Sequence, residues 1–281
     1  MSHNFALIGY PVEHSLSPWI HEQFMTKANI TGTYSKIEIS PQVPFAGVLN
    51  RLKEKNLDGF NITFPYKQTI IPFLDELDES AKAVGAVNTV LCREGKWIGY
   101  NTDGIGYLRS LENKFPELIK DKEKRILLIG AGGAARAIYH ALTEAGCLHI
   151  DIANRTREKA EELSSSISPG HLPRTLSMEE APSLAGNYDL LIQTTSVGMK
   201  PDIGRVVFPL NNLKDEAVAS DIIYQPLETA FLKQAKAAGA KIHFGHTMLL
   251  YQAQYAFEIW TKQRPSTLEM EEQLQQRLEG R

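Results

Sequence analysis

A lysine and an aspartate in the first part of the chain are well suited to acid/base chemistry. Lys67 ends the run Asn-Ile-Thr-Phe-Pro-Tyr-Lys at 61–67, after a strand-like segment, and Asp103 lies in Asn-Thr-Asp-Gly at 101–104. Open α/β sheets bind ligands at the carboxyl ends of their strands. Oxidising an alcohol to a ketone needs a base for the hydroxyl proton, and a lysine can serve if its surroundings tune its pKa. The pair therefore suggests alcohol–ketone chemistry; the alternative is a solvated lysine and an N-cap aspartate.

A glycine-rich turn in the middle of the chain is typical of dinucleotide binding. It directly follows an apolar strand, precedes an alanine-rich helix, and consists of Gly130, Ala131, Gly132, Gly133, Ala134 and Ala135. Glycines let the backbone approach a pyrophosphate, and the helix N-terminus supplies N–H groups and positive dipole. The strand–turn–helix context favours this interpretation over a turn that serves packing alone.

The end of the following strand indicates which dinucleotide is bound. An NAD site usually has an acidic residue about 20 positions after the first glycine, to bind the ribose 2′-hydroxyl. Here the strand is followed by an amide, a hydroxyl and three cations: Asn154, Thr156, Arg155, Arg157 and Lys159. Asp151, within the strand, is a weaker ribose ligand. We therefore expect NADP(H) rather than NAD; the alternative is a solvated helical turn capped by Thr156.

Hydroxyl and amide side chains elsewhere could hold a small polar substrate. Ser15 and Ser17 follow the first strand, so together with the next helix N-terminus they could bind a carboxylate, although Ser17 could equally be the N-cap. Asn88 lies in a strand-like run at 85–89. Gln252 is an amide on the apolar face of a long helix and needs a partner if buried, either substrate or a backbone group.

No metal site is expected. His243 and His246 are close in sequence, but no cysteine or third histidine is suitably placed, which favours histidines at the edge of a loop.

Two successive α/β patterns must position these residues. Strands and helices alternate over residues 5–63, and a second series begins at residue 125. A long helix over 246–262 follows, and then a helix started by a capping box of Ser266 and Glu269. The pattern predicts an N-terminal, mainly parallel α/β substrate domain (1–103 plus 240–281) and a Rossmann domain (104–239). The C-terminal helices are expected to return to the first domain, with a cleft between the two domains.

Composition narrows the class of protein. The 281 residues are 43% hydrophobic and 22% charged, which is ordinary for a globular protein. A net charge of −3 argues against nucleic acid as a partner. The two cysteines, Cys92 and Cys147, suggest a reducing compartment. No apolar run reaches the roughly 18 residues of a membrane span, and the first residues do not resemble a secretory signal. We expect a cytoplasmic protein with no membrane association.

Taken together, these motifs resemble the shikimate dehydrogenase family. Later motifs agree with it, at 195–199 (Thr-Ser-Val-Gly-Met), 224–226 (Tyr-Gln-Pro) and 245–249 (Gly-His-Thr-Met-Leu), so the resemblance extends from Ile8 to Trp260. That family reduces 3-dehydroshikimate to shikimate with NADPH, on the route to chorismate and the aromatic amino acids. Two departures from the family pattern are Lys159, where arginine is common, and Gln-Thr at 193–194 in place of Asn-Ala.

The resemblance implies a role for each matching position. The acid/base pair would be Lys67 and Asp103, which also bind substrate. The substrate carboxylate would be held by Ser15, Ser17 and Tyr224, and the ring groups by Asn61, Thr63, Asn88 and Gln252. The pyrophosphate would lie on residues 130–135, and the 2′-phosphate on Asn154, Arg155, Thr156 and Lys159, helped by Arg157. Other positions near the cofactor would be Glu79, Thr195, Ile222 and Gly245.

Two other functions fit parts of the pattern. A quinate/shikimate dehydrogenase would accept NAD as well as NADP and tolerate the extra hydroxyl of quinate. A non-catalytic dinucleotide sensor would keep the glycine loop but lose the reacting pair, and both Lys67 and Asp103 are present. The sequence leaves open whether the protein is a monomer or a homodimer.

Overall fold

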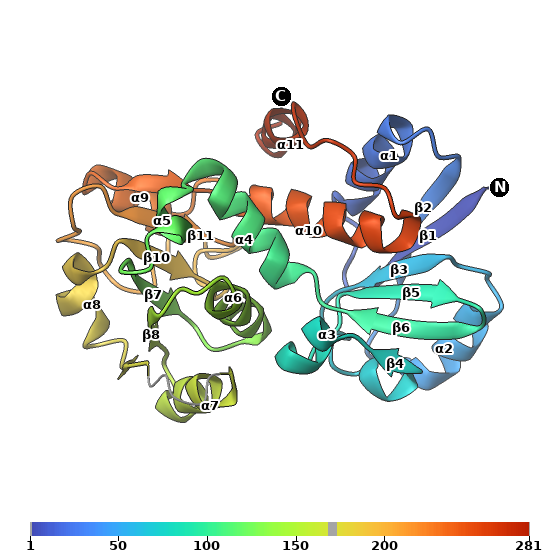
Figure 1. Cartoon of the computed structure of the whole chain (residues 1–281), viewed down its shortest axis with the longest axis horizontal. Helices are drawn as coiled ribbons and strands as arrows, with labels where there is room; N and C mark the ends of the chain where they lie inside the picture. Colours follow the sequence, from blue (N-terminus) through green and yellow to red (C-terminus); the bar gives the residue numbers. More distant parts are fainter. Residues whose placement is uncertain (1, 168–172, 281) are drawn as a thin grey trace. The chain divides into compact units, whose positions relative to one another are not determined.

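The computed structural model describes residues 2–167 and 173–280, which divide into two compact units (Figure 1). Unit 1 comprises Met1–Gly106 and Gln252–Thr267, and unit 2 comprises Tyr107–Tyr251 and Leu268–Arg281. The division falls inside two helices, α4 (Asp103–Lys114) and α10 (Gly245–Thr261), and not at the predicted residues 103 and 240. A division inside a continuous helix leaves no mark on the sequence, because the apolar pattern continues across it.

Unit 1 is built on a mainly parallel sheet with strand order β2-β1-β3-β5-β6-β4. Only β5 runs antiparallel to its neighbours among these strands, so the predicted fold class is confirmed. The strands are β1 (His3–Gly9), β2 (Gly32–Glu38), β3 (Gly59–Ile62), β4 (Glu76–Leu77), β5 (Thr89–Arg93) and β6 (Lys96–Tyr100). The helices that lie wholly in this unit are α1 (Ser17–Lys27), α2 (Phe45–Lys53), the 3₁₀ helix η1 (Ile71–Phe73) and α3 (Glu79–Val84).

The second half of α10 packs on the sheet of unit 1. The Trp260 indole Nε1 donates a hydrogen bond to the Val90 carbonyl oxygen at 2.9 Å, and its ring stacks on Phe5 of β1. The predicted return of the chain to the first domain is therefore correct for this half of α10. The terminal helix α11 (Met270–Leu278) belongs to unit 2.

Unit 2 contains a parallel sheet with the order β12-β11-β10-β7-β8-β9, which is the order of a Rossmann fold. The strands are β7 (Arg125–Ile129), β8 (His149–Ala153), β9 (Thr175–Leu176), β10 (Leu190–Gln193), β11 (Val218–Asp221) and β12 (Lys241–His243). The remaining helices are α5 (Glu117–Lys120), α6 (Gly133–Glu144), α7 (Arg157–Ile167), α8 (Ala181–Leu184), the 3₁₀ helix η2 (Ala185–Asn187) and α9 (Ala230–Ala237).

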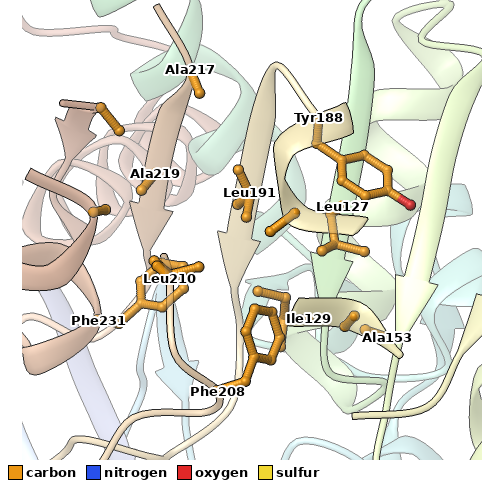
Figure 2. Packing of buried hydrophobic residues seen from close by; sticks show 14 of the residues in the cluster. Leu127, Ile129, Ala153, Tyr188, Leu191, Phe208, Leu210, Ala217, Ala219 and Phe231 are labelled. Atoms are coloured by element: carbon orange, nitrogen blue, oxygen red, sulfur yellow. The ribbon is translucent and has the colours of Figure 1, made fainter. Parts of the chain in front are cut away.

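The strands of the Rossmann sheet are buried at successive positions, as residues 126–129 of β7 show, and one face of the sheet carries a single apolar cluster. Leu127 and Ile129 of β7, Leu191 of β10 and Ala219 of β11 point into one cluster, which Phe231 of α9 also joins (Figure 2). Strands covered on both faces need apolar residues at every position and not alternate ones. This packing fixes the carboxyl ends of β7, β10 and β11, from which the loops of the predicted cofactor site emerge.

Several local predictions are corrected by the structure. Residues 85–88 are not a strand, because Gly85 ends α3 in the left-handed conformation and β5 begins at Thr89. The predicted capping box does not form, since α11 begins at Met270 after Glu269 in a left-handed conformation. The composition of residues 164–173, rich in Ser, Pro and Gly, predicts a loop, but helix α7 continues to Ile167, and residues 168–172 lie outside the described part.

No helix within residues 2–167 and 173–280 is long and apolar enough to cross a membrane.

Candidate functional site

The predicted acid/base pair forms in unit 1. Lys67 Nζ donates a hydrogen bond to Asp103 Oδ2 at 2.6 Å. The lysine side chain is 34% exposed and the aspartate side chain 11%, so the ammonium can reach a ligand while the carboxylate is mostly shielded from water. Asp103 is the first residue of α4, and its carboxylate bonds other side chains and does not cap the helix. The N-cap alternative for Asp103 is therefore wrong.

A buried amide orients the carboxylate of this pair. Asn88 Nδ2 donates to Asp103 Oδ1 at 2.8 Å, so each carboxylate oxygen has its own donor. The orientation of the Asn88 amide is fixed because its Oδ1 accepts from the Thr102 backbone N–H at 2.8 Å and from Thr89 Oγ1 at 3.0 Å. Asn88 is 3% exposed, and reversing its amide would break its bonds to the Thr102 N–H and the Asp103 carboxylate, because the first can only donate and the second only accept. The Asp103 carboxylate is thus held in one geometry by side chains of the protein itself.

Gln252 reaches the same network from α10. Its Oε1 lies 3.4 Å from Asn88 Nδ2. Helix α4 comes close to α10 at this point, because a Cβ on Gly106 would lie 2.5 Å from the backbone nitrogen of Gln252. Glycine at 106 is thus required for Gln252 to approach Asn88. The Gln252 amide thus has a side-chain partner, Asn88, whereas the sequence suggested either the substrate or a backbone group.

Ser15 and Ser17 lie together at the start of α1. Leu16, not Ser17, occupies the N-cap position, and no side-chain cap bond forms. Ser15 Oγ instead accepts the backbone N–H of Ser17 at 3.2 Å and lies 3.2 Å from Ser17 Oγ. The N-cap alternative for Ser17 is therefore wrong. Two adjacent hydroxyls at a helix N-terminus form the arrangement expected for binding a carboxylate.

The glycine loop of unit 2 connects β7 to α6 as predicted. Gly130 has φ = +112°, and a Cβ there would lie 2.5 Å from Thr194 Oγ1, so this position needs glycine to fold. Gly132 differs, because its φ of −87° is open to any residue and a Cβ would meet no heavy atom of the described chain within 4 Å. Packing within the described residues does not require glycine at 132. The absence of a side chain leaves room for a group lying on the N-terminus of α6.

The three cations after β8, Arg155, Arg157 and Lys159, are exposed. Within the described residues, Arg155 and Lys159 make no ion pair, whereas Arg157 Nε bonds Glu161 Oε1 at 3.1 Å. Asp151 is occupied elsewhere: it accepts from the Arg174 backbone at 3.0 Å and from a tyrosine hydroxyl at 2.8 Å. The only carboxylate of β8 is thus committed to structural bonds, which strengthens the preference for a 2′-phosphate.

The loops after β10 and β11 are joined by a buried carboxylate. Gln193 Nε2 donates to Asp221 Oδ1 at 3.2 Å and to the Val197 carbonyl at 3.1 Å, and its Oε1 accepts from the Thr195 backbone. Asp221 also accepts from the Ile223 backbone at 2.9 Å. Burial raises the Asp221 pKa to about 6. Gln193, a departure from the family pattern, therefore holds the backbone of the Thr195 loop.

The remaining predicted residues lie in several places. Thr63 is half-buried at the end of β3, and Glu79 is exposed and pairs with Lys82 at 2.6 Å. Ile222 and Tyr224 follow β11 in unit 2, where burial raises the pKa of the Tyr224 phenol. Gly245 begins α10 against the backbone of Ile222. The structure brings Asn61, Lys67, Asn88, Asp103 and Gln252 into one network, and the catalytic and binding roles of all the predicted residues stay predictions.

Two buried residues of the network were missed. Thr102 forms hydrogen bonds with Asn88 through both its backbone and its side chain. Its position in the Asn-Thr-Asp-Gly motif at 101–104, next to Asp103, could have identified it as a site residue. Tyr34 Oη donates to Asn61 Oδ1 at 2.8 Å, but a tyrosine in a strand carries no signal of such a role.

The two histidines that we expected at a loop edge are buried. His243 in β12 is 1% exposed and His246 in α10 is 3% exposed, so the loop-edge interpretation is wrong. The described residues contain no group of three or more His, Cys, Asp or Glu side chains placed to hold a metal ion.

Comparison with known proteins decides the family. Three family profiles match: the shikimate dehydrogenase substrate binding domain at residues 7–90, shikimate/quinate 5-dehydrogenase at 111–201, and the shikimate 5′-dehydrogenase C-terminal domain at 245–275. The shikimate dehydrogenase (NADP(+)) of Oceanobacillus iheyensis is 51% identical over 281 residues, covering 100% of both chains. This chain belongs to the shikimate dehydrogenase family.

Solved structures of this family share the whole fold. The shikimate 5-dehydrogenase of Thermus thermophilus, in complex with NADP(H) and shikimate, is 35% identical, with a TM-score of 0.85 over 98% of this chain and 99% of that one. The quinate dehydrogenase of Corynebacterium glutamicum, in complex with NAD, is 29% identical, with a TM-score of 0.87 over 96% and 98%. The predicted family and the predicted α/β fold with a Rossmann domain are confirmed.

Proposed function

We propose that this chain catalyses the reversible, NADPH-dependent reduction of 3-dehydroshikimate to shikimate, a step in chorismate and aromatic amino-acid biosynthesis. It is an NADP-dependent oxidoreductase of the shikimate dehydrogenase family. The observation that carries the assignment to this reaction is the pair of Lys67 Nζ and Asp103 Oδ2 at 2.6 Å, with its carboxylate fixed by Asn88.

Lys67 is the acid/base of the proposed reaction. NADPH, when bound, supplies the hydride that turns the carbonyl carbon into a secondary alcohol carbon. Lys67 Nζ donates a proton to the carbonyl oxygen in that direction and accepts the hydroxyl proton in the reverse direction. Asp103 accepts a hydrogen bond from Nζ, and the remaining lone pairs of its carboxylate accept from a substrate hydroxyl. Because Asn88 holds Asp103, the pair does not reorganise during proton transfer.

The residues of unit 2 fit the cofactor. The open space at the Gly132 Cβ position suits the pyrophosphate on the N-terminus of α6. Arg155 and Lys159, exposed and without ion pairs in the described residues, suit the 2′-phosphate, with Asn154 and Thr156 beside them. The Asn154 side chain bonds the Thr156 carbonyl at 2.7 Å and holds this turn in shape.

A direct assay tests the proposed function. Purified protein is mixed with shikimate, and the absorbance of reduced nicotinamide is followed with NADP and NAD in parallel, with quinate as a second substrate. We expect fast reduction with shikimate and NADP only. Comparable rates with quinate or NAD would favour the quinate/shikimate dehydrogenase alternative. No reaction from a folded sample that binds cofactor would contradict the catalytic assignment and favour a dinucleotide sensor.

Replacing Arg155 by alanine is expected to weaken NADP binding by about 10- to 100-fold, because hydrogen bonds to a charged group contribute about 1.5–3 kcal/mol. NAD lacks the 2′-phosphate, so its affinity should change less than about threefold. Titration calorimetry with both cofactors on wild type and Arg155→Ala measures the difference. Equal losses for NADP and NAD would instead point to a packing role for Arg155.

Three further statements stay predictions: the cytoplasmic location, the absence of nucleic-acid and membrane partners, and the choice between monomer and homodimer. The free thiols of Cys92 and Cys147 are compatible with a reducing compartment.

A further inference from the structure

A continuous path of hydrogen bonds crosses unit 1 from Tyr34 to the Asp103 carboxylate. Each member donates to the next through its side chain, at distances of 2.8–3.0 Å. The order is Tyr34, Asn61, Thr89, Asn88 and Asp103. Bonds aligned in one direction polarise each other, so such a path is stronger than its separate links.

Tyr34 is the first donor of this path. Its phenol hydroxyl donates to Asn61 Oδ1 at 2.8 Å. Asn61 in turn uses its Nδ2 to donate to Thr89 Oγ1 at 3.0 Å and to the Asn88 backbone carbonyl at 3.1 Å. The Asn88 carbonyl can only accept, so it sets the orientation of the Asn61 amide, and the Tyr34 hydroxyl is the donor that satisfies the buried Asn61 Oδ1.

The Tyr34 ring is held firmly in place. It stacks on His21 with ring centroids 4.3 Å apart and an interplanar angle of 6°. His21 is completely buried, and within the described residues its ring nitrogens have no hydrogen-bond partner of normal geometry. A buried polar ring without a hydrogen bond destabilises the fold. The favourable interaction that the His21 ring makes with Tyr34 is therefore the stacking of the two rings.

We propose that Tyr34 is a positioning residue for the substrate, supporting the amide network around Lys67 and Asp103 through Asn61. The proposal rests on the proposed function and adds a residue that touches neither the reacting atoms nor the cofactor. Without the hydroxyl, the buried Asn61 Oδ1 loses its donor, and the unsatisfied oxygen shifts the amide toward another donor. That shift would weaken the Asn61 bonds to Thr89 and Asn88 and loosen Asp103.

Tyr34→Phe removes the hydroxyl alone and keeps the stacked ring. We expect the KM for shikimate to rise about tenfold, kcat to fall less than about threefold, and the KM for NADP to stay unchanged. The matched control is Tyr66→Phe, because Tyr66 is also buried, stacks on Phe45 at 4.3 Å, and donates its hydroxyl to the Ile39 backbone carbonyl at 2.7 Å. The control should lose a similar amount of thermal stability and leave the KM for shikimate unchanged.

A second readout does not depend on activity. The Thr102 backbone N–H donates to Asn88 Oδ1, so its hydrogen exchange reports the orientation of that amide. In Tyr34→Phe this exchange should be about tenfold faster than in wild type, and in Tyr66→Phe it should not change. Unchanged Thr102 exchange, or an unchanged KM for shikimate in an active enzyme, overturns the proposal, as does an equal rise in KM in both variants. An inactive wild type with faster Thr102 exchange in Tyr34→Phe alone overturns only the proposed function.

Discussion

Replacing Lys67 by alanine is expected to lower the rate of shikimate oxidation by about 10²- to 10⁴-fold, the usual contribution of a positioned acid/base. Its Nζ is the titratable donor that bonds Asp103 Oδ2, and the substitution leaves the carboxylate without its cation. NADP affinity should stay near wild type, because Arg155 and the glycine loop belong to unit 2. Steady-state kinetics with shikimate and a separate NADP titration measure the two quantities.

Lys96→Ala is the matched control for this prediction. Lys96 Nζ pairs with Glu76 Oε1 at 2.7 Å on the surface of the same unit, so the control also removes a short lysine–carboxylate pair. Exposed pairs of this kind contribute about 0–1 kcal/mol, and turnover should not change. A Lys67→Ala enzyme that melts normally and keeps full turnover would remove Lys67 from the mechanism.

Acidification is expected to unfold unit 1 through His21. Burial lowers its pKa from 6.5 to about 3, an effect that the nearby Asn61 side chain opposes only in part. The unfolded chain therefore binds this proton below pH 6.5 and the folded chain does not until about pH 3. The free energy of unfolding should fall as pH decreases through this window, by about 1.4 kcal/mol per pH unit well below pH 6.5.

Tryptophan fluorescence isolates this effect, because the three tryptophans, Trp19, Trp97 and Trp260, all belong to unit 1. Urea unfolding at pH 7, 6 and 5 should give falling midpoints at constant slope. His21→Phe keeps an aromatic ring against Tyr34 and should lose the decrease that His21 causes. Equal midpoints of the wild type at pH 7 and pH 5 would show that His21 is not buried in its neutral form.

Unit 2 should also lose stability in acid, but with an opposing contribution. Burial is the main reason that the pKa of His243 is lowered to about 3 and that of His246 to about 4, and nearby Lys114 adds to both shifts. Asp221 acts in the opposite direction, because its pKa is raised to about 6 and its folded form gains stability as pH falls toward 3.8. Between about pH 6 and pH 4 the unfolded chain therefore binds two protons on the histidines, and the folded chain binds one on Asp221. The difference of one proton lowers the free energy of unfolding of unit 2 by ~1.4 kcal/mol per pH unit as pH falls.

The sequence by itself determined the local elements and the motifs that they carry. The glycine loop was recognisable because a strand, a tight turn and a helix follow each other within 20 residues, and the predicted alanine-rich helix forms as α6, Gly133–Glu144. Lys67 and Asp103 were identified because each lies at the end of a strand or the start of a helix in a short polar motif. Signals of this kind depend on neighbours along the chain, so a single sequence contains them.

The tertiary structure alone decided how these motifs are connected. Tyr34 on β2 and Asn61 on β3 lie on either side of β1, and the parallel pairing of β1 with both strands brings the two side chains within 2.8 Å. The orientation of the Asn88 amide follows from Thr89 and Thr102, residues that reach it from different strand ends. These hydrogen-bond partners depend on the strand order, which brings the side chains together, and on burial, which requires each buried polar group to have a partner. Neither the strand order nor the burial can be read from the spacing of residues along the chain.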